Sequence, residues 1–205
     1  TMLSTFQSTK CGRIRTRHWT SARWTPAAPP ISAAKNRRLT ESEFQKQKRA
    51  IETLSHTSYH ISESNQGRIA TRQQLAQSAS FDHLLFLDAD VLPTSENFIK
   101  AYLAHIDSNF DAVYGGVAYS SIKPEAAYLL RWTYGKLKED ISAKKRNETP
   151  YKSIVSANFL MKTAVFLKIN SEITYRGYGS DNHFSAQLKK EKVSILHIDN
   201  DVYHL

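Results

Sequence analysis

The sequence of 205 residues contains one cysteine, Cys11, and lacks long apolar runs. A single cysteine excludes an internal disulfide framework and a metal cluster built from several cysteines. No apolar run approaches the roughly 18 residues that a membrane-spanning helix needs. The first residues also lack the apolar core of a secretory signal peptide. We therefore expect a soluble, cytoplasmic protein, which agrees with the low cysteine content.

Acidic residues are absent from residues 1–38, which hold eight of the 28 Lys and Arg residues. Residues 39–205 carry 20 basic and 19 acidic side chains, so the net charge of +9 belongs almost entirely to the N-terminal segment. Nucleic acid is therefore not an expected partner, because residues 39–205 lack a basic patch with interleaved aromatic residues. Residues 1–38 show neither helical nor strand periodicity. Their composition predicts a basic tail that is disordered or not native to the fold.

Segments with helical and strand patterns alternate from residue 39 onward, which predicts an α/β domain over residues 39–205 with a mixed, mainly parallel sheet flanked by helices. Helices are expected in residues 39–54, 68–79, 93–106, 124–146, 157–169 and 181–192. Strands are expected in residues 58–61, 83–88, 111–120 and 193–205, and a strand or turn opens the segment at 157. In the helix expected over 124–146, positions 126, 130, 133, 134, 137 and 141 keep helical spacing and share one face.

Two carboxylates directly follow an apolar run in LLFLDADVLP, residues 84–93. The run predicts a buried strand, and ligands of open α/β sheets gather at the carboxyl ends of strands. Asp88 and Asp90 are two positions apart, so both can lie on one side of an extended segment. Carboxylates this close repel each other unless one is protonated or a cation lies between them. The pair indicates a site for Mg²⁺ or Mn²⁺, with one alternative: one Asp caps a turn and the other is solvated.

Two enzyme families use such a motif. The segment FLDADVL resembles the start of the haloacid dehalogenase phosphatases, in which Asp88 would be a nucleophile and Asp90 an acid or base. That family carries its motif near the beginning of the domain, whereas a turn and a helix precede it here. Glycosyltransferase family 2 is the resemblance we favour, and it covers roughly residues 40–205.

The resemblance to glycosyltransferase family 2 rests on several segments in the family's order. They are NQGRIATRQQLA, LLFLDADV, GGVAYS, SANFLMKTAVF and YRGYGSDNHFSAQLKKEKVSILHIDNDVYHL. The resemblance implies the GT-A fold, a Rossmann-like α/β architecture. It also implies inverting transfer of a sugar from a nucleotide-sugar donor to a glycan or lipid-linked acceptor, with peripheral association at the inner face of a membrane as one option. The family's first strand and acidic DDGS turn have no match in residues 1–38, so the N-terminal part of the fold looks incomplete.

The resemblance also assigns roles to the residues that match the family's motifs. Asp88 and Asp90 would hold Mn²⁺ or Mg²⁺ beneath the donor diphosphate, and His204 would complete the metal site. A cation there neutralises the charge that develops on a leaving diphosphate. The start of a helix that carries arginines suits a diphosphate or nucleotide. The expected donor-binding residues are Asn65, Gly67, Arg68, Arg72 and Asp88.

Asp181 matches the family's catalytic base, which takes the proton from the acceptor hydroxyl. It stands at the expected start of a helix, where the helix dipole favours an ionised carboxylate. The preceding residue is Ser180, where the family usually has Glu. Because that Glu takes part in acceptor binding in the family, the resemblance implies that this chain binds its acceptor differently. The expected acceptor-binding residues are Asn158, Tyr178 and Ser180. His197, within VSILHID, is interpreted as a strand residue with a satisfied ring.

Three functions remain open at this point. The first is a metal-dependent family 2 glycosyltransferase, and the second is a phosphatase of the haloacid dehalogenase type that uses the DAD motif. The third is a degenerate, non-catalytic glycosyltransferase-like module that binds a partner through its basic tail.

Overall fold

The computed structural model describes residues 3–8, 13–18, 41–54, 57–61, 64–174 and 179–204. The helices in this part of the chain are α1 Glu41–Glu52, α2 Gly67–Gln77, α3 Phe98–Leu103, α4 Ala126–Lys138, α5 Ala143–Glu148, α6 Thr163–Ser171 and α7 Ser180–Lys190. The strands are β1 Leu3–Ser8, β2 Arg13–His18, β3 Thr57–Ile61, β4 His83–Asp88, β5 Val91–Pro93, β6 Ala112–Tyr114, β7 Val117–Ala118, β8 Asn158–Lys162, β9 Ile195–His197 and β10 Val202–His204.

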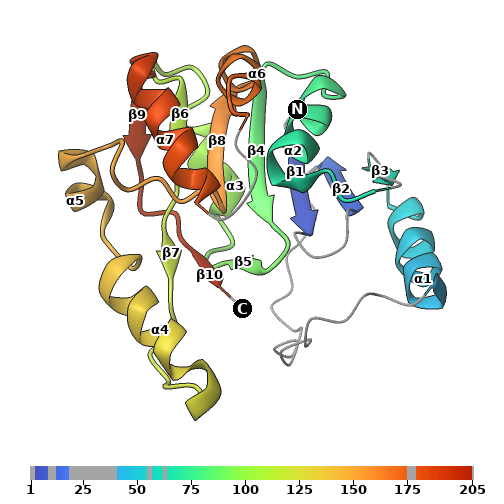
Figure 1. Cartoon of the computed structure of the whole chain (residues 1–205), viewed down its shortest axis with the longest axis horizontal. Helices are drawn as coiled ribbons and strands as arrows, with labels where there is room; N and C mark the ends of the chain where they lie inside the picture. The colour runs from blue at the N-terminus through green and yellow to red at the C-terminus, as the bar shows by residue number, and fades with distance from the viewer. Residues whose placement is uncertain are drawn as a thin grey trace.

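A seven-stranded sheet forms the centre of the fold, with the strand order β3-β2-β1-β4-β8-β6-β9 (Figure 1). Two neighbouring pairs, β1–β4 and β6–β9, are parallel. The other four pairs are antiparallel, because β2 and β8 run against both of their neighbours. The fold is therefore a mixed α/β fold, and the expectation of a mainly parallel sheet is wrong. A second sheet has the order β5-β10-β7.

Two strands lie in the segment where the sequence showed no strand periodicity. Strand β1 pairs in parallel with β4, from Leu3 opposite Leu84 to Gln7 opposite Asp88. Strand β2 pairs with β1 on one side and with β3 on the other. The other residues before position 41 lie outside the described part of the chain, so the tail and the domain boundary at residue 39 stay predictions.

Strand β4 is buried on both faces because its alternate residues enter two different apolar clusters. Leu84 and Phe86 pack in the cluster that contains residues of α2, α6 and α7. Leu85 and Leu87 pack in the cluster that contains residues of α3 and of the small sheet. All four side chains are at most 2% exposed. The buried strand expected over residues 83–88 is confirmed, and it ends at Asp88.

The strand expected over residues 111–120 is divided into β6 and β7, with Gly115 and Gly116 between them. A Cβ atom on Gly115 would lie 2.3 Å from Nδ2 of Asn158, so only glycine leaves room there. The Asn158 amide donates to the carbonyl oxygens of Gly116 (3.1 Å) and Asn200 (2.8 Å). Its oxygen accepts a hydrogen bond from Tyr102 Oη (2.6 Å). The chain leaves the large sheet at these glycines, and the strand expected over 193–205 is likewise divided into β9 and β10.

The helix expected over residues 124–146 is divided into α4 and α5, and α4 extends away from the large sheet at the lower left of Figure 1. The ring of Tyr119 lies against Gly135, where a Cβ atom would be 2.1 Å from ring carbon Cζ. Trp132 Nε1 donates to the carbonyl oxygen of Ser120 (2.8 Å). These two contacts determine which side of α4 faces the protein.

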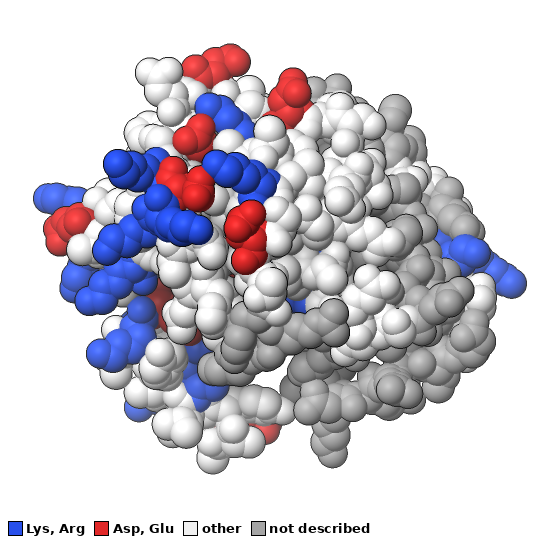
Figure 2. All heavy atoms as spheres, turned by 45° about the horizontal axis from the view of Figure 1, so that its top comes forward, with Lys and Arg blue, Asp and Glu red and all other residues white. Residues whose placement is uncertain are grey.

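Charged side chains of both signs are interleaved on the face shown in Figure 2. This arrangement agrees with the near-balanced charge of residues 39–205. None of the helices within the described ranges has the length and apolar character needed to cross a bilayer.

His197 is buried on β9, and its ring is satisfied as expected. Its Nδ1 accepts a hydrogen bond from Arg146 Nη1 (3.1 Å), because a guanidinium can only donate. Its Nε2 therefore carries the proton and donates to the carbonyl oxygen of Pro150 (2.9 Å). Burial lowers the pKa of His197; the hydrogen bond to Pro150 opposes this, and the charge of Arg146 adds to it.

We expect Gly135→Ala to lower the free energy of unfolding by about 1–3 kcal/mol, because the added methyl group meets the Tyr119 ring. Urea unfolding followed by circular dichroism measures the change. Thr133→Ala, at an exposed position of the same helix, is the matched control and should change stability by less than about 0.5 kcal/mol. Equal effects of the two substitutions would show that the Tyr119 contact does not hold α4.

We expect His197 to contribute to acid unfolding. Its pKa in the folded protein lies below the unfolded value of about 6.5, so its contribution to stability is complete above that pH. The contribution is lost as the pH falls from about 6.5 through the folded pKa. His197→Phe should therefore flatten the fall of the unfolding free energy on acidification. A fall that is identical in wild type and His197→Phe would refute this assignment.

Candidate functional site

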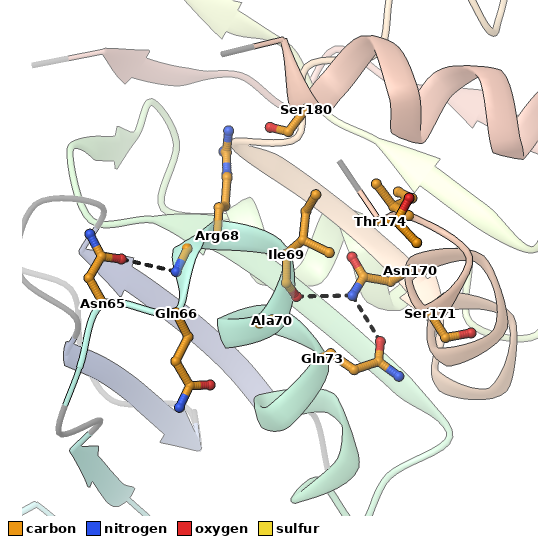
Figure 3. Close-up of a pocket in the computed structure, with 12 residues that line it drawn as sticks. Asn65, Gln66, Arg68, Ile69, Ala70, Gln73, Asn170, Ser171, Thr174 and Ser180 are labelled. Carbon is orange, nitrogen blue, oxygen red and sulfur yellow. Dashed lines mark hydrogen bonds between the residues drawn. The ribbon is translucent and has the colours of Figure 1, made fainter. Parts of the chain in front are cut away.

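The turn before α2 is built by Asn65 and Gly67. Oδ1 of Asn65 accepts a hydrogen bond from the backbone N–H of Gly67 (3.0 Å). Gly67 has a φ of 79°, a left-handed conformation that favours glycine. The turn starts α2 so that the next residue, Arg68, points toward the N-terminal end of α7 and Ser180 (Figure 3).

Asp88 and Arg72 form a buried ion pair at the end of β4. They are 7% and 5% exposed, and Nη2 of Arg72 lies 2.8 Å from Oδ1 of Asp88. The same Nη2 donates to the carbonyl oxygen of Ser156 (2.5 Å), and the guanidinium lies 5.6 Å from the ring centroids of Phe86 and Phe159. Burial lowers the pKa of Arg72 to about 10, and the charge of Arg68 adds to this. Arg72 therefore stays charged at neutral pH and needs the carboxylate beside it.

Arg68 joins two carboxylates that are far apart in the sequence. Its Nη2 is hydrogen-bonded to Oδ2 of Asp88, and its Nη1 lies 3.4 Å from Oδ1 of Asp181. Burial opposes the charge of Arg68, but Asp88, Asp181 and Asp90 outweigh this effect and raise the pKa of Arg68. The guanidinium thus acts as an internal cation between the end of β4 and the start of α7.

Asp181 is in the first turn of α7, which follows Gly179 in a left-handed conformation with a φ of 94°. Its Oδ1 accepts a short hydrogen bond from Ser156 Oγ (2.5 Å). Its Oδ2 has a longer contact, with the backbone N–H of Ser156 (3.4 Å). The Asp181 side chain is 33% exposed, so this carboxylate has both a fixed orientation and access to solvent.

A cavity of about 600 Å³ opens beside this cluster, between α2, α6 and the start of α7 (Figure 3). Four residues expected at the site line it: Asn65, Gly67, Arg68 and Ser180. Asn170 closes one side by donating to the carbonyl oxygen of Ile69 (3.0 Å) and to Oε1 of Gln73 (2.8 Å). The cavity has one charged wall, at Arg68, and otherwise amide, hydroxyl and apolar side chains.

Asn158 is not part of the cluster. Asn158 is fully buried, and all the hydrogen bonds of its side chain go to Tyr102, Gly116 and Asn200. An acceptor role for Asn158 thus stays a prediction, and its contacts indicate a role in the fold. Tyr178 lies outside the described residues.

The three expected metal ligands, Asp88, Asp90 and His204, differ in their exposure and in their contacts. Asp88 forms ion pairs with two arginines, whereas Asp90 is exposed in the turn between β4 and β5. His204 on β10 pairs with Val91, the residue after Asp90, and its ring is stacked on Tyr119 with centroids 6.1 Å apart. Within the described ranges, no group of three or more His, Cys, Asp or Glu side chains could hold a metal ion. The roles of Asp90 and His204 as metal ligands stay predictions.

The sequence analysis missed Ser156 and Asn170, which orient Asp181 and close the cavity. Asn170 had a detectable signal, because it lies four residues after Phe166 on the buried side of α6. A polar residue at a core position of a helix indicates a specific hydrogen bond. Ser156 had no such signal, since serine before a strand is common.

Comparisons with known proteins identify a family. The sequence model described as "Glycosyl transferase family 2" matches residues 44–169. No curated protein matches the chain.

Solved structures give weaker matches. Glucosyl-3-phosphoglycerate synthase from Mycobacterium tuberculosis, in complex with Mg²⁺ and uridine diphosphate, has 12% identity and a TM-score of 0.44 over 70% of this chain and 48% of that chain. A197 from STIV has 14% identity and a TM-score of 0.36, over 67% and 66% of the two chains. The bifunctional IspDF from Campylobacter jejuni has 9% identity and a TM-score of 0.40, over 76% and 36%. The chain spans about half the length of the Mycobacterium tuberculosis enzyme.

We expect the two aspartates of the DAD motif to differ in their effect on stability. Asp88→Ala leaves the buried guanidinium of Arg72 without a carboxylate and should lower the free energy of unfolding by about 3 kcal/mol. Asp90→Ala, at an exposed position two residues away, is the matched control and should change it by less than about 0.5 kcal/mol. Urea unfolding of both variants measures the difference. Similar effects of the two substitutions would contradict a structural role for Asp88.

Proposed function

We propose that this chain, which belongs to glycosyl transferase family 2, transfers a sugar from a nucleotide-sugar donor to an acceptor hydroxyl. One observation supports this most strongly. Arg68 connects Asp88 and Asp181 at the wall of a cavity that the N-terminal end of α2 also lines. A sugar transferase needs a cationic place for a diphosphate and a carboxylate nearby to take a proton. The cluster offers both, and we infer that it lies in a GT-A fold.

The donor diphosphate is proposed to bind at the start of α2. The backbone N–H groups of a helix's first turn and a guanidinium together attract phosphate oxygens. Arg68 has a planar fork of donors and lines the cavity, whereas Arg72 is buried and used by Asp88 and Ser156. Arg68 is therefore the arginine that would contact the diphosphate, and Arg72 would hold the surrounding backbone. Asn65 and Gly67 would shape the turn rather than make the main contact.

Asp181 is proposed to be the catalytic base of an inverting transfer. Its Oδ1 is fixed by Ser156, and its Oδ2, which among the described residues has the 3.4 Å contact to the Ser156 backbone, would accept the proton of an acceptor hydroxyl. The acceptor oxygen then forms a bond to the anomeric carbon while the bond to the diphosphate breaks. Ser180 lines the cavity next to Asp181 and would contact the acceptor, a glycan or a lipid-linked sugar.

Mn²⁺ or Mg²⁺ is proposed to be held by Asp90 and His204, together with diphosphate oxygens. A cation bound there neutralises charge on the leaving diphosphate. Asp88 is left out of this set because both of its oxygens are already paired with arginines. Arg68 would share the neutralisation of the diphosphate from the other side.

The phosphatase alternative is disfavoured by the environment of Asp88. That mechanism needs Asp88 as an accessible nucleophile, but the residue is 7% exposed and each of its oxygens is engaged by a guanidinium. The family match points the same way.

We expect the chain to bind a nucleoside diphosphate in the presence of Mn²⁺. Isothermal titration with UDP and GDP, with and without Mn²⁺, is the measurement. Arg68→Ala should raise Kd about tenfold or more, because hydrogen bonds to a charged partner are lost. Asp90→Ala should remove the effect of Mn²⁺ while keeping the fold, as checked by circular dichroism.

Arg131→Ala is the matched control, because this arginine of α4 is paired with Glu139, just after the helix, and does not line the cavity. It should bind nucleotide like the wild type. A folded wild type that binds neither nucleotide with Mn²⁺ would rule out the donor proposal and favour a non-catalytic module. Unchanged binding by Arg68→Ala would place the diphosphate elsewhere.

A further inference from the structure

Arg68 is already engaged at the place where the proposed donor diphosphate needs it. Its Nη2 is hydrogen-bonded to Oδ2 of Asp88, and its Nη1 lies 3.4 Å from Oδ1 of Asp181. The Arg68 side chain lines the cavity and points toward the start of α7, where Asp181 follows Ser180 (Figure 3). A diphosphate that binds Arg68 must therefore compete with one of these two carboxylates.

The two contacts of Arg68 differ in strength. Asp88 is fixed at the end of β4 by Arg72, and its side chain is 10% exposed. Asp181 meets Arg68 at the longer distance of 3.4 Å, and its side chain is 33% exposed. An ion pair that solvent reaches contributes little to stability, whereas breaking a buried pair leaves a charge without a partner. The contact to Asp181 is thus the one that an entering anion displaces.

Asp181 keeps its place without Arg68. Its Oδ1 accepts a hydrogen bond from Ser156 Oγ (2.5 Å), and its Oδ2 lies 3.4 Å from the backbone nitrogen of Ser156. Ser156 is 1% exposed, and its carbonyl oxygen accepts a hydrogen bond from the buried Arg72 (2.5 Å). The exchange therefore requires movement of the Arg68 side chain alone, which is 24% exposed and borders the cavity.

The surrounding charges and an unused donor of Arg68 favour this exchange. Three carboxylates act on the charge of Arg68; they are Asp88, Asp90 and Asp181. A phosphate group beside Arg68 repels Asp181, because like charges that lie close together repel each other. Nε of Arg68 is buried and has no hydrogen-bond partner within the described ranges. A buried donor without a partner is unfavourable, and turning the guanidinium toward a phosphate group would give this N–H an acceptor.

We propose that the Arg68–Asp181 ion pair and a donor diphosphate exclude each other, so that binding of the diphosphate releases Asp181 from Arg68. Asp181 opposes donor binding until a phosphate oxygen takes its place at Nη1 of Arg68. The carboxylate that takes the acceptor proton is then free of the guanidinium only beside a bound donor. This inference rests on the proposed function, because that function assigns the diphosphate to Arg68 and the proton to Asp181.

Isothermal titration of the full chain with UDP and GDP in the presence of Mn²⁺ tests the exchange. Asp181→Asn keeps the size of the side chain and removes the charge that competes for Arg68. It should bind the nucleotide about two- to fivefold more tightly than the wild type, the range expected for a partly exposed ion pair. In the Arg68→Ala background the same substitution should change Kd by less than about 1.5-fold, because no guanidinium remains to be freed.

Asp107→Asn is the matched control, because it removes one negative charge at an exposed position near His83, at the opposite end of β4 from Asp88. It should bind the nucleotide like the wild type. Circular dichroism checks the fold of each variant. Asp181→Ala also removes the competing charge and should tighten binding as well, so it replaces Asp181→Asn if that variant is unfolded.

The results distinguish a failure of this inference from a failure of the proposed function. If the wild type binds neither nucleotide, or if Arg68→Ala binds like the wild type, the proposed donor site is wrong and the exchange is wrong with it. If Arg68→Ala weakens binding but Asp181→Asn does not tighten it, the exchange alone is wrong. Tightening of the same size in the Arg68→Ala background or in Asp107→Asn would also overturn the exchange, since it would show a general effect of charge.

Discussion

The buried ion pair between Arg72 and Asp88 is the interaction on which the rest of the site depends. A guanidinium inside a fold needs a carboxylate and further acceptors, and here Asp88 and the carbonyl oxygen of Ser156 supply them. Through these bonds one side chain joins α2, the end of β4 and the segment before β8. The fixed Asp88 then leaves its second oxygen to Arg68, which extends the network to Asp181. The buried Arg72 thus positions Asp88, Asp88 positions Arg68, and Arg68 contacts Asp181 near the surface.

Strongly periodic segments could be predicted from the sequence, whereas strand direction and strand breaks could not. Residues 83–88 form the expected strand because the side chains of residues 84–87 enter two apolar clusters and are all apolar. The period of two is the same in parallel and antiparallel strands, so the reversed direction of β8 had no signal. The break at Gly115 depends on Asn158 and Asn200, which are distant in sequence. Strands β1 and β2 belong to a segment whose composition indicated no strand at all.

Four residues that were assigned to the site from the sequence lie close together in the structure, and their roles stay predictions. Arg68, Arg72, Asp88 and Asp181 were named from the sequence, and the structure brings them into one network. Spacing alone could not reveal that Arg68 and Arg72 contact Asp88, because a carboxylate can be satisfied by a guanidinium or by a metal ion. Nor could it reveal that Asn158 is used inside the fold, since an asparagine at the start of a strand suits either a ligand or a backbone contact.

The unequal environments of Asp88 and Asp90 should lead to different patterns of sequence variation at the two positions. Position 88 is tied to position 72 by charge, so a neutral residue at one position would favour a neutral residue at the other. Position 90 is exposed in a turn and has no such tie to Arg72. In related sequences, positions 72 and 88 should therefore vary together, while position 90 varies only with the chemistry of what it binds. Two aspartates of one short motif are thus under two separate constraints, one from the stability of the fold and one from whatever the exposed carboxylate binds.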